Sequence, residues 1–480
     1  MRLIKNISIV GLGAVMAQGL TALTLPILTR LYTPDSFSLW ALFMSTSAIF
    51  SGMATMRYEL AVVLPRDRTI AINLAIGGVG IAFVISIIAG LVMWILGSSI
   101  LEDYKFESVG LWAFLLAIII LSTAIYQIGL AWCTREAAFK TYAIAQFLLP
   151  VTILICQTTS AILWQQSGMG LITGTVGGQF ICTCGIFFIV LWGNKKAFRD
   201  VHKANKIGST LALYKQYPLF MTPYTLLGVT RERLAFFLIG KFGAVDSVGF
   251  YSIATRLANL PNSLITSTLR PVFFHHAAEK NIKTLENFIL ISCRILGIIV
   301  IVFLAPCIAQ ATWLTKIILG TNWGEAAPYV VVLSIPMIPL LMGNWLDRIF
   351  DILGRQRTAL ILEFVFTTLA LIGLIGSYLI FRDLFFAICI QSGLLTIYYI
   401  FWLAMLFHIA GFNKIKLIWI VSEITFVGML SILIAFGLGA IMSPAPAFAI
   451  ALLVAMAVVC LYLYRAWIEF GKINSTTANA

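Results

Sequence analysis

The chain has 480 residues, of which 61% are hydrophobic and only 11% are charged, and its mean hydropathy is +1.00. Such a chain has too little polar surface to cover a globule in water, so the composition excludes a soluble protein and indicates an integral membrane protein. A net charge of +13 would by itself suit a nucleic-acid partner. The positions of the basic residues along the chain decide whether the charge indicates such a partner or an orientation in the membrane.

Apolar runs long enough to cross about 30 Å of hydrocarbon recur along the whole chain. We expect the first of them to be a retained membrane helix rather than a signal peptide, because it leads directly into a second membrane helix. The stretches between the runs are too short for a soluble domain. The runs predict fourteen membrane helices, at residues 7–28, 37–60, 71–97, 111–132, 142–164, 169–192, 217–239, 247–272, 288–310, 328–350, 358–380, 384–408, 417–441 and 446–467.

The basic residues lie mainly on one side of the predicted membrane. With both termini in the cytoplasm, 22 of the 32 Lys and Arg are cytoplasmic, and 5 lie in external loops. This bias predicts that orientation. The densest basic stretch, residues 194–206, then lies beside anionic lipid headgroups, so the charge requires no nucleic-acid partner.

A short segment occurs twice in the chain. A shift of 211 residues places "LTRLYTPDSFSLW" (Leu28–Trp40) on "IGKFGAVDSVGFY" (Ile239–Tyr251), with Asp35 on Asp246 and Arg30 on Lys241. The copies join helices 1 and 2 and helices 7 and 8. Because six helices separate them, the sequence predicts two halves of the same orientation, related by an axis along the membrane normal.

The repeat sets the expected architecture: an all-α polytopic membrane protein with two six-helix lobes and two further helices. The predicted domains are an N-terminal lobe at residues 1–193, a basic cytoplasmic linker at 194–216, a C-terminal lobe at 217–408, and helices 13 and 14 with a cytoplasmic tail at 409–480.

Helix 8 carries a polar stripe along its whole length. Polar residues recur on it every three or four positions, which places them on one face: Ser252, Thr255, Arg256, Asn259, Ser263, Thr266 and Arg270. The equivalent face of helix 2 holds mostly small residues: Ala41, Met44, Ser45, Ala48, Gly52, Thr55 and Glu59. Two readings are open: small residues that let helices pack closely, favoured for helix 2, or a hydrated cavity, favoured for helix 8.

Charges inside the membrane need partners or water, since an arginine at the bilayer centre costs roughly 3 kcal/mol. We expect Arg57 and Arg294, both near cytoplasmic helix ends, to reach the headgroups. Arg231 and Arg233 lie about 200° apart around helix 7, with Glu232 between them. Arg256 is deeper in the membrane.

Two readings of Arg256 are open: it pairs with a carboxylate such as Glu232, or it binds an anion. For the membrane carboxylates Glu363 and Glu423 we expect solvated or paired side chains. The eight cysteines lie in or beside apolar runs and are most simply small hydrophobes, so we expect neither a metal site nor a cofactor.

The chain resembles a known family at residues 28–65. The run "LTRLYTPDSFSLWALFMSTSAIFSGMATMRYELAVVLP" is similar to the amino-terminal signature of bacterial Wzx-type polysaccharide flippases, in the multidrug/oligosaccharidyl-lipid/polysaccharide exporter superfamily. Ser38 replaces the glycine expected after the aromatic residue, whereas the second copy has Gly249 there.

The resemblance implies a transporter, not an enzyme, in the bacterial inner membrane. It implies alternating access that moves an undecaprenyl-pyrophosphate-linked oligosaccharide to the periplasmic leaflet, with membrane lipids, a polysaccharide polymerase and a chain-length regulator as partners. The expected substrate-binding residues are Arg256, Asn259, Ser252, Ser263, Arg231, Arg233, Glu232, Ser45, Arg57 and Glu59. Arginine forks suit the pyrophosphate, and hydroxyls and amides suit the sugars.

Three alternatives stand beside this one. A flippase for another lipid-linked polymer precursor is the nearest. A multidrug exporter of the same superfamily is expected to have acidic rather than arginine-bearing cavity residues. A membrane glycosyltransferase or polymerase is expected to need a larger external loop than residues 98–110 or 311–327 supply.

Overall fold

A computed structural model describes residues 2–101, 109–163, 167–193, 207–243, 245–279, 285–347, 349–350, 353 and 355–478. These residues form helices joined by short connections, and no strand occurs among them. The basic stretch at 194–206 and most of the predicted external loop at 98–110 lie outside the described residues.

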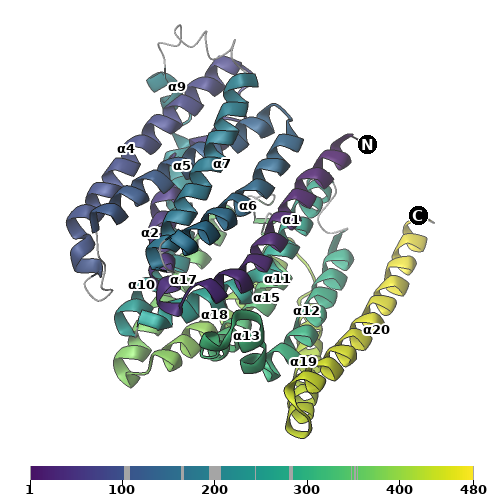
Figure 1. The fold of residues 1–480 in the computed structure, drawn as a ribbon. Coiled ribbons are helices and arrows are strands. Elements are labelled where there is room, and N and C mark those ends of the chain that lie inside the picture. The colour runs from purple at the N-terminus through teal and green to yellow at the C-terminus, as the bar shows by residue number, and fades with distance from the viewer. Residues whose placement is uncertain are drawn as a thin grey trace. The chain divides into compact units, whose positions relative to one another are not determined.

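The chain folds as two compact units, Met1–Ser252 and Ile253–Ala480 (Figure 1). The helices of the first unit are α1 (Arg2–Leu31), α2 (Pro34–Met53), α3 (Tyr58–Ala61), α4 (Arg68–Leu101), α5 (Val109–Arg135), α6 (Phe139–Leu163), α7 (Gly168–Gly193), α9 (Ile207–Leu213), the π-helix η3 (Tyr217–Met221), α10 (Thr222–Phe242) and the start of α11 (Val245–Glu279).

The second unit contains the rest of α11. Its other helices are α12 (Glu286–Ala309), α13 (Ala311–Leu319), the 3-10 helix η5 (Thr321–Trp323), α14 (Ala326–Ser334), α15 (Met337–Gly343), the 3-10 helix η6 (Asn344–Leu346), α17 (Gln356–Phe381), α18 (Leu384–Ala410), α19 (Lys414–Ile441) and α20 (Pro444–Ala478).

In the first unit, α7 packs between α5 and α6, and α2 contacts α5, α7 and α10. Glycines on one face of α7 allow the closest of these approaches, because a Cβ at Gly174 would lie 2.6 Å from the Cα of Gln157 on α6. Gly178, one turn later, meets the backbone of Ile153 in the same way. Small residues spaced by four in this manner let two membrane helices pack backbone to backbone.

The two copies of the repeated segment have the same local structure. Arg30 and Lys241 lie in the last turns of α1 and α10, and Asp35 and Asp246 lie in the first turns of α2 and α11. Negative charge at a helix start and positive charge at a helix end both complement the helix dipole. The repeat therefore extends from the sequence to the charged first and last turns of the helices.

The two copies also touch each other within the first unit. Ser38, which is fully buried, donates its hydroxyl hydrogen to the Pro34 carbonyl at 3.1 Å. A Cβ at Gly249 would lie 2.9 Å from the Ser38 Oγ, and it would come closer still to the Pro34 carbonyl oxygen. The serine of the first copy is thus accommodated because the equivalent residue of the second copy is glycine.

In the second unit, buried side chains of α12, α15, α18 and α19 form one apolar cluster around Trp345, which is 1% exposed. The rings of Phe273 and Phe288 meet Trp345 edge-on at 5.1 and 6.5 Å between centroids. The predicted helix at 328–350 is interrupted here: α14 and α15 are bent by 40° at Ile335 and Pro336. Proline lacks the N–H that would continue the helix, which explains the break.

The predicted all-α, polytopic fold class is confirmed, whereas fewer than the fourteen predicted crossings meet the length and composition expected of a membrane span. Within the described residues, eleven helices are long and apolar enough to cross a membrane, and the bent pair α14–α15 provides a twelfth. The other two predicted crossings are α10, which carries Arg231, Glu232 and Arg233, and α11, which carries the polar stripe. Across the described residues the protein is all-α and polytopic.

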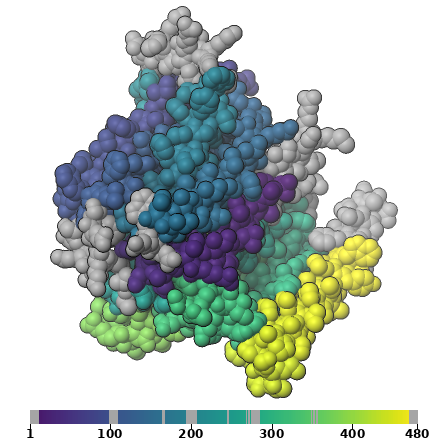
Figure 2. All heavy atoms as spheres, viewed as in Figure 1, coloured from purple at the N-terminus to yellow at the C-terminus, as the bar shows by residue number. Residues whose placement is uncertain are grey.

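The outward surfaces of the helices are apolar. On α4, for example, Trp94 and Ile95 are 65% and 70% exposed, and exposed apolar residues also cover α19 and α20. Side chains fill the spaces between the ribbons of α1, α6 and α7 on the face that Figure 2 shows. A surface of this kind is stable in contact with lipid rather than with water.

The orientation is tested by labelling single cysteines. We expect Asn322→Cys, within η5, to react with a membrane-impermeant maleimide in spheroplasts, because residues 311–327 are predicted to be external. Lys140→Cys, in the first turn of α6, should react only after the membrane is opened. Asn322 and Lys140 are exposed, and the eight native cysteines all lie within helices, so the unmodified chain is the background control. The reverse labelling pattern would contradict the orientation.

Candidate functional site

The predicted helix at 37–60 is broken near its carboxyl end. Met56 and Arg57 have φ angles of 48° and 63°, a left-handed backbone that non-glycine residues rarely adopt. The chain then resumes as the single turn α3. Strained backbone of this kind persists where surrounding contacts hold it, and the contacts here come from Arg57 itself.

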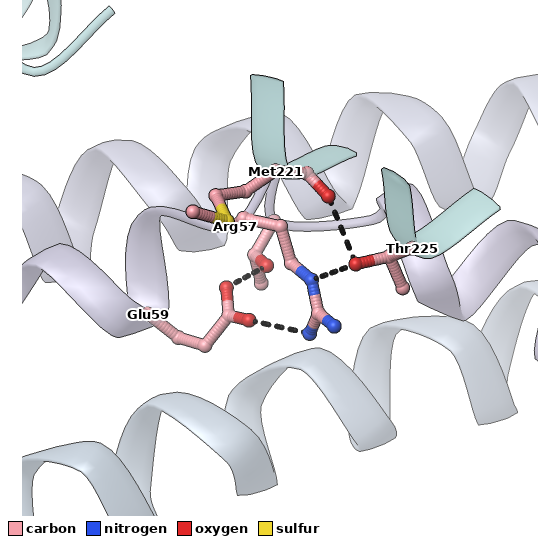
Figure 3. Close-up of polar contacts among 5 residues, drawn as sticks. Arg57, Glu59, Met221 and Thr225 are labelled. Atoms are coloured by element: carbon pink, nitrogen blue, oxygen red, sulfur yellow. Dashed lines mark hydrogen bonds and ion pairs between the residues drawn. The ribbon is translucent and has the colours of Figure 1, made fainter. Parts of the chain in front are cut away.

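Arg57 is at the centre of a polar network in the first unit (Figure 3). Its Nη1 lies 3.0 Å from Oε1 of Glu59, and its Nε donates to the Thr225 hydroxyl of α10 at 2.8 Å. The Thr55 hydroxyl donates to the other oxygen of Glu59, and Thr225 donates to the Met221 carbonyl at 2.9 Å. Arg57 was expected to reach the headgroups; the structure instead pairs it with a carboxylate that is 5% exposed.

The small-residue face of α2 packs against α10. A Cβ at Gly52 would lie 3.6 Å from Val229 and 3.8 Å from Thr225, and α10 contacts α2 directly. Ser45, which is fully buried, donates to the Ala41 carbonyl at 2.7 Å within its own helix. These contacts agree with close packing, the reading favoured for helix 2.

The charged residues of α10 differ in exposure. The Arg231 side chain is 16% exposed, whereas that of Glu232 is 64% exposed, and their closest N and O atoms lie 3.9 Å apart. Arg233 is half-buried. A pair at this distance, with one exposed partner, contributes little to stability.

The polar stripe of α11 crosses from the first unit into the second. Ser252, at the end of the first unit, is buried, Arg256 is half-buried, and Asn259 is exposed. Ser263 donates to the Leu260 carbonyl at 2.9 Å. The side chain of Arg270 lies outside the described residues.

An amide cluster in the second unit joins two of the stripe residues to a residue of η6. Asn262 donates to Asn259 at 2.9 Å, while Thr266 and Asn344 each donate to Oδ1 of Asn262 at 3.2 Å. Sequence reasoning missed Asn262 and Asn344. Asn262 stands one turn after Asn259, so its spacing was a usable signal; Asn344 is 82 residues from Asn262, and no local pattern connects the two.

Two further membrane carboxylates of the second unit are hydrogen-bonded to side chains. Glu423 accepts from Arg294 at 2.7 Å and from Tyr462 at 2.8 Å, and Glu363 accepts from Tyr398 at 2.5 Å. The expectation of paired carboxylates is confirmed. Arg294, like Arg57, pairs with a carboxylate rather than reaching the headgroups as expected.

Metal ligation has no support within the described part of the chain. No group of three or more His, Cys, Asp or Glu residues gathers there. The eight cysteines are free, and Cys133, Cys182 and Cys293 are buried among apolar residues. The arrangement supplies guanidinium, amide and hydroxyl groups, which bind ligands through hydrogen bonds and charge rather than through covalent chemistry.

The fold is that of known membrane transporters. A solved structure described as "Lipid II flippase MurJ, inward closed conformation" matches 97% of this chain and 100% of its own with a TM-score of 0.71 and 11% identity. An inward-facing multidrug resistance MATE family transporter of the MOP superfamily matches 85% of this chain and 95% of its own, with a TM-score of 0.53 and 17% identity. A MATE in the bent conformation matches 86% and 96%, with a TM-score of 0.52 and 15% identity.

The family follows from the sequence. The profile of the family described as "Polysaccharide biosynthesis protein" matches residues 27–328, well over half of the chain, and the chain belongs to this family. The resemblance found at residues 28–65 lies within that match and is confirmed. No curated protein matches the chain by sequence.

The Arg57 network leads to a prediction about stability. Arg57→Ala should lower the stability of the folded protein by about 3 kcal/mol, because it leaves Glu59 buried without its cation. Arg57→Ala combined with Glu59→Ala should recover part of that loss. Thermal unfolding of the detergent-purified protein, followed by fluorescence-detected size exclusion, measures both.

A second ion pair of the same unit provides the matched control. Arg68 and Glu136 lie 3.4 Å apart with both side chains exposed, so Arg68→Ala should have little effect. A double variant no more stable than Arg57→Ala would show that the buried carboxylate is not the source of the instability.

Proposed function

We propose that the protein flips an undecaprenyl-pyrophosphate-linked oligosaccharide repeat unit from the cytoplasmic to the periplasmic leaflet by alternating access. The observation that carries the proposal is the combination of a polysaccharide biosynthesis family with a whole-chain likeness to a structure described as a lipid II flippase. Lipid II, named in that description, is itself a lipid-linked precursor. A flippase for another lipid-linked polymer precursor would have the same support.

The proposed binding residues are polar side chains, each assigned to the part of the substrate that its chemistry suits. Arg256 binds pyrophosphate oxygens, and Asn259, Ser252 and Ser263 contact sugar hydroxyls. The further residues of the proposed site are Arg231, Arg233, Glu232, Ser45, Arg57 and Glu59. Guanidinium suits phosphate because its planar fork keeps its charge and donates two parallel hydrogen bonds.

The proposal includes a cellular location and a division of the chain into moving parts. The protein acts in the inner membrane with both termini in the cytoplasm, without catalysing a reaction. Residues 1–193 and 217–408 act as the two moving lobes, 194–216 links them, and 409–480 adds helices 13 and 14. A polymerase and a chain-length regulator would use the exported repeat unit.

A multidrug exporter is the second candidate, because MATE transporters share the fold. The residues favour the flippase. A site for cationic drugs is expected to be mainly acidic, whereas Glu59, Glu363 and Glu423 are each bonded to side chains, the exposed Glu232 lies between Arg231 and Arg233, and the α11 stripe carries Arg256. The two functions predict opposite signs of charge on the bound group.

Arg256 provides the test of the proposed function. If it binds pyrophosphate, Arg256→Ala should abolish surface polysaccharide in a complemented deletion strain while leaving the membrane protein level unchanged, and Arg256→Lys should retain part of the export. Arg355→Ala removes an exposed arginine at the start of α17 and is the matched control. Immunoblotting of membranes gives the protein level, and gel analysis of extracted polysaccharide gives the export.

The same variant tests the ion-pair reading of Arg256. In that case Arg256→Ala should leave a carboxylate uncompensated and reduce the amount of folded protein, and removing the partner carboxylate should restore it. Full surface polysaccharide in the Arg256→Ala strain, with the protein at its normal level, would contradict both readings.

A further inference from the structure

A chain of hydrogen-bonded amides in the second unit has one direction. Asn344 donates from Nδ2 to the Oδ1 of Asn262 at 3.2 Å, and Asn262 donates from Nδ2 to the Oδ1 of Asn259 at 2.9 Å. Each amide thus gives its N–H to the carbonyl of the next. The chain starts in η6, directly after the end of α15, and ends on the polar stripe of α11.

The direction of this chain is fixed at Asn262. The residue is 7% exposed, so its polar atoms depend on protein partners. Its Oδ1 receives two donors, the Asn344 amide and the Thr266 hydroxyl, which donates at 3.2 Å. Asn344 also donates to the Thr266 Oγ1 at 3.3 Å, which leaves the Thr266 hydroxyl hydrogen for the Oδ1 of Asn262. Turning the Asn262 amide over would set its NH₂ against the NH₂ of Asn344 and would replace both bonds to its Oδ1.

Because Asn262 donates to its carbonyl oxygen, the Asn259 side chain offers N–H donors. Asn259 is exposed, and its carbonyl oxygen is occupied by Asn262, so the amide NH₂ is the group presented outward. Arg256 lies three residues earlier, and residues three apart occupy the same face of a helix. A guanidinium is also a donor without acceptor capacity. This part of the stripe therefore complements an anionic group rich in acceptors.

We infer that Asn344 is a positioning residue for the substrate: through Asn262 it holds Asn259 as a hydrogen-bond donor, so that Asn259 and Arg256 together bind phosphoryl or carboxylate oxygens of the lipid-linked substrate. The inference rests on the proposed function and adds that this part of the binding site offers hydrogen-bond donors rather than acceptors. In this inference Asn259 binds the anionic group, whereas Ser252 and Ser263 keep their proposed contacts with sugar hydroxyls.

The test reverses the direction of the hydrogen bonds that run from Asn344 through Asn262 to Asn259. Asn344→Asp keeps the size of the side chain and removes its donors, so Asn262 should turn its NH₂ toward residue 344 and its carbonyl toward Asn259. Asn259 would then present its carbonyl oxygen to the anion. Binding of undecaprenyl pyrophosphate to the full-length protein in nanodiscs should weaken about tenfold. Asn344→Ala, which adds no charge, should weaken binding less.

A second substitution separates positioning from a structural role. Asn259→Lys places a pure donor at the end of the chain, which does not depend on the direction of the Asn262 amide. In this background Asn344→Asp should no longer weaken binding. If Asn344 merely supported the fold, Asn344→Asp would lower binding and protein yield equally in both backgrounds, and that result would overturn the inference.

The controls distinguish the inference from the proposed function. Asn413 caps α19 by accepting from two backbone N–H groups, which aspartate does equally well, so Asn413→Asp should bind like the unmodified chain. If the unmodified chain neither binds the probe nor exports polysaccharide, the proposed function fails. If it binds and exports, and Asn344→Asp does so equally, only the inference fails.

The choice of probe distinguishes phosphoryl oxygens from carboxylate oxygens as the bound acceptors. Undecaprenyl pyrophosphate carries no sugar, so sensitivity of its binding to Asn344→Asp assigns the donors to the pyrophosphate. Sensitivity confined to export, in cells whose repeat unit carries a sugar carboxylate, assigns them to that carboxylate. Insensitivity in both assays overturns the inference.

Discussion

A charged or amide side chain inside hydrocarbon must have a partner, and this constraint explains where the protein departs from plain apolar helices. Glu59 is compensated by Arg57 and Thr55, and Glu423 by Arg294 and Tyr462. These polar networks also join separate helices: Arg57 bonds to Thr225 of α10, and Glu423 of α19 bonds to Arg294 of α12. Apolar contacts alone would not fix how such helices are aligned along their length. Because an isolated charge at this depth costs several kcal/mol, the paired geometry is the stable one.

The breaks in the helices occur beside these polar groups. The left-handed backbone at Met56 and Arg57 places the Arg57 guanidinium against Thr225 of α10, and η6 carries Asn344 into the amide cluster. Irregular backbone at membrane depth is tolerated only where protein partners satisfy its freed groups. In both places the irregular segment and the polar network therefore stabilise each other, and both lie where an uninterrupted helix was predicted.

The sequence predicts the parts of this structure that depend on local pattern. Apolar run length locates the helices, because a membrane crossing needs a nearly fixed number of residues. The shared acidic residues in the first helical turns of the two repeated segments are visible in the sequence as Asp35 and Asp246. The partners of the buried charges were not predictable, since Arg294 and Glu423 are separated by 129 residues and Arg57 and Thr225 by 168. The break at Arg57 had no sequence signal either, as neither proline nor glycine occurs at Met56 or Arg57.

The repeat makes the difference between its halves informative. Under the shift of 211 residues Ser45 corresponds to Arg256, yet Ser45 is buried and bonded within its own helix, whereas Arg256 is half-buried on a polar stripe. A duplicated fold provides two equivalent helix faces, and only one of them carries the arginine and the amides. The small-residue face of α2 packs closely against α10, while the stripe of α11 keeps its guanidinium, amide and hydroxyl groups, so the two equivalent faces differ in what they can bond to.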